Sequence, residues 1–163
     1  MKIGQDISGE SLFIHMAKKQ PNKIRVFKAK GCPNLDGRTL GLLVKFLKYV
    51  VKELDLEDKE IKIRLLGPNP QEPITTGAYN PSNKTCSTIV AGRNLVDWCR
   101  TIAHELTHYR QDLDGKLNSP HPEIGGEIED DANIYSGRCV KYFIKKILTK
   151  DDKKFLGLGS YGD

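Results

Sequence analysis

The chain has 163 residues, of which 38% are hydrophobic, so it is long enough to form one domain with its own core. Its formal net charge of +5 allows contact with acidic partners. The basic residues form no dense block with interleaved aromatics, so nucleic-acid binding is possible but not favoured. No apolar run is long enough to cross a bilayer, and residues 1–11 lack the apolar segment of a secretory signal. We therefore expect a cytoplasmic protein.

The first half of the chain shows two periodicities. Residues 23–30 alternate apolar and basic side chains, which predicts a strand. Residues 38–54 carry apolar side chains at helical spacing with lysines on one side, which predicts an amphipathic helix. Residues 59–67 alternate again and predict a second strand, which ends at the turn-forming sequence GPNP.

A predicted hairpin and a predicted helix follow. Residues 73–80 and 85–92 are two short strands joined by the turn PSNK, so we expect them to pair antiparallel. Asn94 is a good N-cap, and Gly115 is a good helix stop. These signals predict a helix over about 94–112.

A second long helix is predicted over about 123–148, beginning near Glu123 or Gly126. The remaining residues, 151–163, are rich in glycine, and we expect them to be a loosely ordered tail. The order of elements predicts a single α+β domain over residues 1–150. In this domain the helices pack on a small, mostly antiparallel sheet.

The helix over 94–112 contains the sequence HELTH, which begins at His104. His104 and His108 are four positions apart and therefore lie on one face of a helix, where both imidazoles can bind one metal ion. Glu105 would stand beside that ion. Zinc lowers the pKa of a bound water to about 7, and a neighbouring glutamate can then act as general base. The motif therefore predicts a catalytic zinc site.

Catalytic zinc takes three protein ligands, so one more must come from elsewhere. In one known pattern, HExxHxxGxxH, a glycine turns the chain toward a third histidine. Here Gln111 occupies the glycine position and Asp114 the last position, so the helix should carry Asp114 away from the metal. Asp114 stays a minor candidate. The acidic sequence GGEIEDDAN in the following helix offers Glu127, Glu129, Asp130 and Asp131, of which the two glutamates lie on different faces.

Helical periodicity separates these two glutamates. The face that contains Glu129 continues through Asn133 to mainly apolar residues, as in a packed helix with a ligand near one end. The face that contains Glu127 is mostly charged. Glu129 is therefore the favoured third ligand. Ala132 is small enough to let the two helices approach, and Asn133 could hydrogen-bond His104 or His108.

HELTH followed by EDDAN resembles the gluzincin-type zinc metallopeptidases, which pair HExxH with a downstream ExxA[ND] helix. The resemblance covers roughly residues 74–140, and the compact form is similar to small phage and bacterial intracellular members, sometimes called minigluzincins. It implies a zincin-like fold and one Zn²⁺ per chain, bound by His104, His108 and Glu129. It also implies that Glu105 is the general base and that the protein is a zinc metalloendopeptidase.

The resemblance further implies that an edge strand holds an extended peptide substrate. The residues in that position are Gly77, Ala78 and Tyr79. A tyrosine or histidine often stabilises the oxyanion in this family, but no motif identifies it here. The candidates are Tyr109, His121 and Tyr135.

Two other interpretations remain open. The fold could serve as a binding or structural module with weak or latent activity, and the tail FLGLGSYGD could occupy the cleft of its own or a neighbouring chain. Alternatively, the basic helical segment RCVKYFIKK and a pI near 9.0 would suit a DNA-associated protease. Substrate specificity and oligomeric state cannot be read from the chain.

Overall fold

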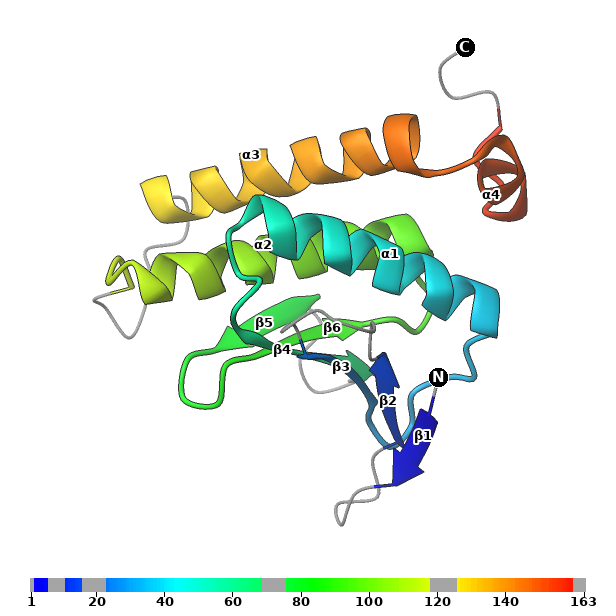
Figure 1. The fold of residues 1–163 in the computed structure, drawn as a ribbon, viewed down its shortest axis with the longest axis horizontal. Helices are drawn as coiled ribbons and strands as arrows, with labels where there is room; N and C mark the ends of the chain where they lie inside the picture. The colour runs from blue at the N-terminus through cyan, green and yellow to red at the C-terminus, as the bar shows by residue number, and fades with distance from the viewer. Residues whose placement is uncertain (1, 6–10, 16–22, 69–75, 118–125, 160–163) are drawn as a thin grey trace.

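The computed structural model describes residues 2–5, 11–15, 23–68, 76–117 and 126–159. They form a mixed sheet with helices packed on it, which confirms the α+β class (Figure 1). The sheet has six strands in the order β1-β2-β3-β4-β6-β5. The strands are β1 (Lys2–Gln5), β2 (Ser11–His15), β3 (Lys23–Lys28), β4 (Glu60–Leu66), β5 (Gly77–Asn80) and β6 (Thr85–Ile89).

The centre of the sheet differs from the expectation of a mostly antiparallel arrangement. β3 pairs parallel to β4, and β4 pairs parallel to β6, while β1–β2, β2–β3 and β5–β6 are antiparallel. The helix between β3 and β4 returns the chain to the end of the sheet where β3 began, so the next strand runs in the same direction. Local alternation in the sequence indicates strands but does not determine which strand pairs with which.

The predicted hairpin is confirmed and forms one edge of the sheet. β5 and β6 pair antiparallel, with Gly77 opposite Thr88 and Asn80 opposite Thr85. Among the described strands, β5 has a partner on one side only. It therefore leaves a row of backbone groups facing away from β6.

The helices are α1 (Gly37–Glu53), α2 (Leu95–Leu113), α3 (Glu127–Tyr142) and α4 (Lys150–Phe155), with a π-helical turn, η1 (Phe143–Ile147), directly after α3. α2 lies against the sheet, and α3 runs across α2 on the side away from the strands (Figure 1). The predicted helices over 94–112 and 123–148 are thus confirmed. Gly126 is the N-cap of α3, whereas Glu123 lies outside the described residues.

The core joins all these layers. Alternate residues of β3 and β4 are buried beneath α1 and α2. The far end of α3 packs on α1 through two aromatic pairs. The Phe46 and Phe143 ring centroids are 5.0 Å apart, and Tyr49 stacks on Tyr142 at 4.9 Å. None of the helices that the structure describes has both the length and the apolar character needed to span a bilayer.

The prediction of a loosely ordered tail over 151–163 did not anticipate α4. Thr149 caps this helix: its hydroxyl accepts a hydrogen bond from the Asp152 backbone N–H, and its own backbone N–H donates to the Asp152 carboxylate, each at 3.0 Å. This reciprocal capping box stabilises the start of a short helix that would be marginal alone. Residues 160–163 lie outside the described part of the chain.

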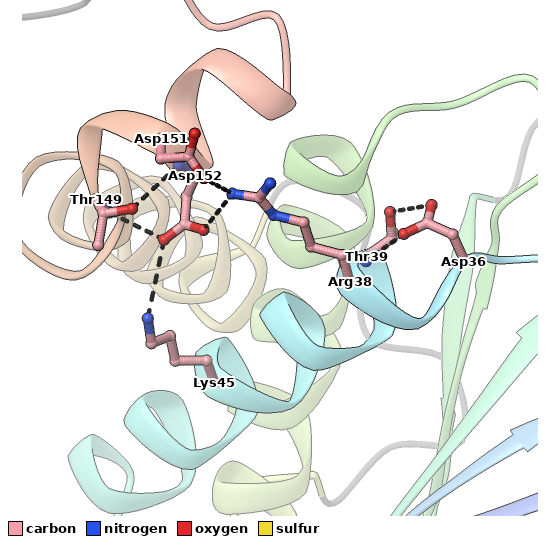
Figure 2. A network of polar contacts seen from close by, with 7 residues as sticks. All are labelled: Asp36, Arg38, Thr39, Lys45, Thr149, Asp151 and Asp152. Atoms are coloured by element: carbon pink, nitrogen blue, oxygen red, sulfur yellow. Dashed lines mark hydrogen bonds and ion pairs between the residues drawn. The ribbon is translucent and has the colours of Figure 1, made fainter.

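Ion pairs fasten α4 to the start of α1 (Figure 2). The Arg38 guanidinium contacts Asp151 at 2.6 Å and Asp152 at 3.1 Å, and Lys45 lies 3.9 Å from Asp152. Burial disfavours the charged Asp152 carboxylate, but its bonds to Thr149 and Arg38 prevail, so its pKa is lowered. Each acid at this junction therefore has a basic partner.

Candidate metal centre

The helix that carries HELTH is capped at its start and enclosed along its length. The Asn94 side chain accepts a hydrogen bond from the Asp97 backbone N–H at 3.0 Å, as the N-cap prediction requires. The sheet lies on one side of α2 and α3 on the other. His108 is therefore buried, His104 is partly buried, and both face the first turns of α3.

Three side chains converge between α2 and α3. The two imidazole Nε2 atoms of His104 and His108 lie 3.0 Å apart. Glu129, in the first turn of α3, places Oε2 at 3.2 Å from His104 Nε2 and Oε1 at 3.2 Å from His108 Nε2. The structure thus brings together the three residues that the sequence predicted as ligands.

Gln111 determines which nitrogen of His108 carries a proton. The Gln111 side-chain NH₂ donates to the Ile128 carbonyl at 3.0 Å, so the amide oxygen is the atom that faces His108 Nδ1, at 2.8 Å. A carbonyl oxygen can only accept, and His108 must therefore donate from Nδ1. In a neutral imidazole the lone pair is then on Nε2, which faces His104 and Glu129.

The surroundings of His104 favour its neutral form. Burial, followed by the neighbouring His108, lowers the pKa of His104, although Glu129 and a hydrogen bond with Asn133 act in the opposite direction. The imidazole is therefore neutral near pH 7 and can offer a lone pair to a metal. Asn133, which the sequence offered as a hydrogen-bond partner of His104 or His108, lies close enough to His104 to influence its pKa.

The donor atoms fit a metal ion. Lone pairs and carboxylate oxygens at about 3 Å repel one another unless a proton or a cation lies between them. Zinc bonds of about 2.0–2.2 Å at tetrahedral angles would place neighbouring donor atoms roughly 3.3–3.6 Å apart. The observed separations of 3.0 and 3.2 Å are slightly shorter than this. His104, His108 and Glu129 could therefore hold a metal ion.

Glu105 lies beside this cluster and is not part of it. Its side chain is buried, and burial together with the nearby Glu129 carboxylate raises the pKa of Glu105 to about 8. The backbone amide of Tyr79 opposes this shift. A carboxyl group whose pKa lies near neutrality can both accept and donate a proton, which is what a general acid–base residue requires.

Gly77 lets the edge strand approach the site. A Cβ atom at this position would lie 2.2 Å from Thr101 Cγ2, 2.9 Å from the Ser87 carbonyl oxygen and 3.2 Å from Glu105 Oε1. Only glycine fits such a contact. The backbone of β5 therefore lies directly against the part of α2 that carries Glu105.

Tyr79 anchors the same strand further along. Its hydroxyl donates to Asp112 at 2.6 Å, Lys84 pairs with the same carboxylate, and its ring stacks on Tyr109 with centroids 5.4 Å apart. The contacts tie the hairpin to the end of α2. Ala78, between Gly77 and Tyr79, is exposed on the opposite side.

The other candidates do not join the cluster. Asp114 is the C-cap of α2 and pairs with Arg110 at 2.8 Å, and Glu127 is exposed. Tyr109 stacks on Tyr79, and the buried hydroxyl of Tyr135 lies near Cys139. His121 lies outside the described residues. No oxyanion-stabilising tyrosine or histidine is therefore identified within the described part of the chain.

Sequence reasoning missed three polar residues of the site. Gln111 was interpreted only as the absence of a glycine, although an amide three positions after His108 lies on the same helix face. Arg93 and Arg100 line a cavity of about 560 Å³ that also contains His104 and Glu105. Arg100 lies one helical turn before His104, and that spacing was the available signal.

Comparison of the chain with protein-family models, with curated proteins and with solved structures finds no match. The resemblance to gluzincins therefore depends on the sequence motifs alone, chiefly HELTH and EDDAN.

Proposed function

We propose that the protein is a zinc-dependent metallopeptidase that hydrolyses internal peptide bonds. The observation that carries this proposal is the convergence of His104, His108 and Glu129, with the buried Glu105 carboxyl beside them. Two imidazoles and one carboxylate form a ligand set known from catalytic zinc sites, in which a fourth position stays open.

Each residue would have a distinct role. His104, His108 and Glu129 would hold the metal, and bound zinc would supply a Lewis acid that polarises a carbonyl group and makes water more acidic. Glu105 would accept a proton from the attacking water at its carboxylate and then donate that proton to the leaving amine. Because Glu105 is buried, few solvent water molecules can reach its carboxylate and compete with this proton transfer.

The edge strand β5 is the observation that favours an extended peptide as the substrate. β5 has an unpaired side among the described strands, and Gly77 brings its backbone against Thr101 and Glu105. A peptide that paired with β5 would gain main-chain hydrogen bonds beside the reacting groups. Such pairing would select peptides by their extended backbone conformation and not by one particular side chain.

The test combines metal analysis with hydrolysis of a set of quenched fluorescent peptides. Wild type should contain about one zinc per chain. Glu105→Gln should keep the metal and lose about 10²–10⁴-fold in kcat, because only proton transfer is removed. Glu129→Ala should lose both metal and activity.

Two results would contradict the proposal in different ways. Wild type that binds no zinc would exclude the metal site. Wild type that binds zinc and hydrolyses no peptide would favour the alternative of a binding module with latent activity. The described part of the tail forms α4, which lies beyond the C-terminal end of α3 (Figure 1). Glu129 lies at the opposite end of α3, so this part of the tail does not occupy the cavity beside Glu129 in its own chain.

A further inference from the structure

The cavity beside the metal cluster has a basic end. Its lining passes from His104 and Glu105 toward the start of α2, where it includes Arg93, Asp97 and Arg100. Arg100 precedes His104 by four residues, which corresponds to about 6 Å along a helix axis. A group held at Arg100 would therefore lie within one or two residues of a peptide bond placed at Glu105.

Arg93 is fixed in place by neutral partners. Its guanidinium donates to the Ile89 carbonyl at 2.8 Å, to Thr101 Oγ1 at 2.9 Å and to the Asp97 carbonyl at 3.1 Å. These partners orient the guanidinium but do not neutralise it. Arg93 thus gives this end of the cavity a positive charge that no described carboxylate pairs with.

Arg100 is exposed and extends toward α3. Its Nη2 atom is the nearest group to Gly137, at 3.9 Å from the position of an added Cβ. Within the residues that the structure describes, Arg100 makes no hydrogen bond or ion pair. The side-chain carboxylate of Asp97, in the same part of the lining, forms no ion pair with either arginine among the described residues. The five donors of Arg100 are therefore available to a ligand.

We propose that Arg100, supported by the field of Arg93, forms a subsite for a carboxylate of the substrate. A guanidinium binds a carboxylate through two parallel hydrogen bonds, which gives both affinity and orientation. The carboxylate could be an acidic side chain or the C-terminus of the peptide. This inference rests on the proposed function, since it names the class of substrate that the same cavity would select.

The test measures binding separately from catalysis. It uses the Glu105→Gln protein, with and without zinc, and three labelled hexapeptides in fluorescence anisotropy. One peptide has a glutamate and an amidated C-terminus, the second has a glutamine and a free C-terminus, and the third has a glutamine and an amidated C-terminus. We expect at least one carboxylate peptide to bind about tenfold or more tightly than the neutral one, as a charged hydrogen bond implies.

Variants identify the residue responsible. Adding Arg100→Gln should remove the preference, whereas adding Arg138→Gln should leave it unchanged, because Arg138 is an exposed arginine of α3 outside the cavity lining. Equal binding of all three peptides would overturn the proposal. So would a preference that survives Arg100→Gln, or one that disappears when zinc is removed, since the metal would then be the carboxylate ligand.

The outcomes distinguish this subsite from the peptidase function. If wild type hydrolyses neutral and acidic peptides with the same kcat/KM, the subsite is wrong and the peptidase function stands. If no peptide is hydrolysed but the carboxylate preference is present and depends on Arg100, the subsite stands and the peptidase function is wrong.

Discussion

Two clusters of polar side chains, one where α4 meets α1 and one between α2 and α3, are built in opposite ways. At the junction of α4 with α1, Asp151 and Asp152 are matched by Arg38 and Lys45 (Figure 2). Between α2 and α3, the Glu129 carboxylate faces two imidazole nitrogens at 3.2 Å, with a second carboxyl group close by. One cluster has matched charges, and the other has an excess of acceptors.

The difference shows which cluster needs something from outside the chain. Opposite charges that satisfy one another stabilise a junction and leave nothing to bind. Acceptors held together by folding destabilise the metal-free protein, and a cation would relieve that repulsion. Four experiments test this difference between the two clusters.

The largest expected effect is the stabilisation by zinc. At 100 times the dissociation constant, zinc should raise the free energy of unfolding of wild type by about 2.7 kcal/mol. Glu129→Gln should lose most of this gain, because it removes an anionic ligand. Glu127→Gln is the matched control, since Glu127 is exposed in the same helical turn, and it should respond as wild type does. Denaturant unfolding with and without zinc would measure this, and an equal response in Glu129→Gln would contradict it.

The second largest effect is expected on the affinity for zinc when Gln111 is replaced. Gln111→Met has a similar length but cannot accept from His108 Nδ1, and we expect it to weaken zinc binding about 10–100-fold. Gln111→Glu should recover part of the affinity because a carboxylate can still accept that hydrogen bond. Competition with a fluorescent chelator would measure both constants. Wild-type affinity in Gln111→Met would show that the hydrogen bond does not orient the ligand.

The pKa of Glu105 predicts a pH dependence in the metal-free protein. Between pH 4.5 and about 8 the folded state keeps a proton on Glu105 that the unfolded state has released. The folded state therefore binds more protons, and stability should fall as pH rises through this window. Glu105→Gln should lack this component of the slope. If urea unfolding at several pH values gives the same slope for both metal-free proteins, Glu105 is not held protonated.

The smallest expected effect comes from a direct comparison of the Asp152 cluster and the Glu129 cluster in metal-free protein. Asp152→Asn should destabilise it by about 1 kcal/mol through loss of the negative charge that pairs with Arg38 and strengthens the hydrogen bond from the Thr149 backbone N–H, with Asp151→Asn as the milder control. Because the pKa of Asp152 is lowered, its contribution should be present above about pH 4 and lost at lower pH. Glu129→Gln should be neutral or stabilising. Destabilisation by Glu129→Gln as large as that by Asp152→Asn would remove the contrast.

Local periodicity was enough to predict α1, α2 and α3 and the proposed ligand set. The spacing of His104 and His108 fixes their common face, and the face of Glu129 differs from that of Glu127 in any regular helix. The parallel pairings of β4 could not be predicted in this way, because pairing depends on the path of the chain and not on alternation within a strand.

Two other features had local signals that were not used. The sequence TKDD places Asp152 three residues after Thr149, which is the spacing of the capping box that begins α4. Arg100 lies one turn before His104, on a face already expected to hold the site. Whether Arg100 has a partner among the described residues depends, in contrast, on the position of α3, so only the structure could show that it has none.

The enclosure of α2 has a consequence for how such a chain could evolve. The residues of HELTH pack against the sheet on one side and α3 on the other, so most substitutions there would alter folding and chemistry together. Arg100 and Asn133 border the same cavity from exposed positions, where replacement has little cost to folding. Descendants of this chain would be expected to change at this rim, and with it what the cavity can bind, while the buried helix stays constant.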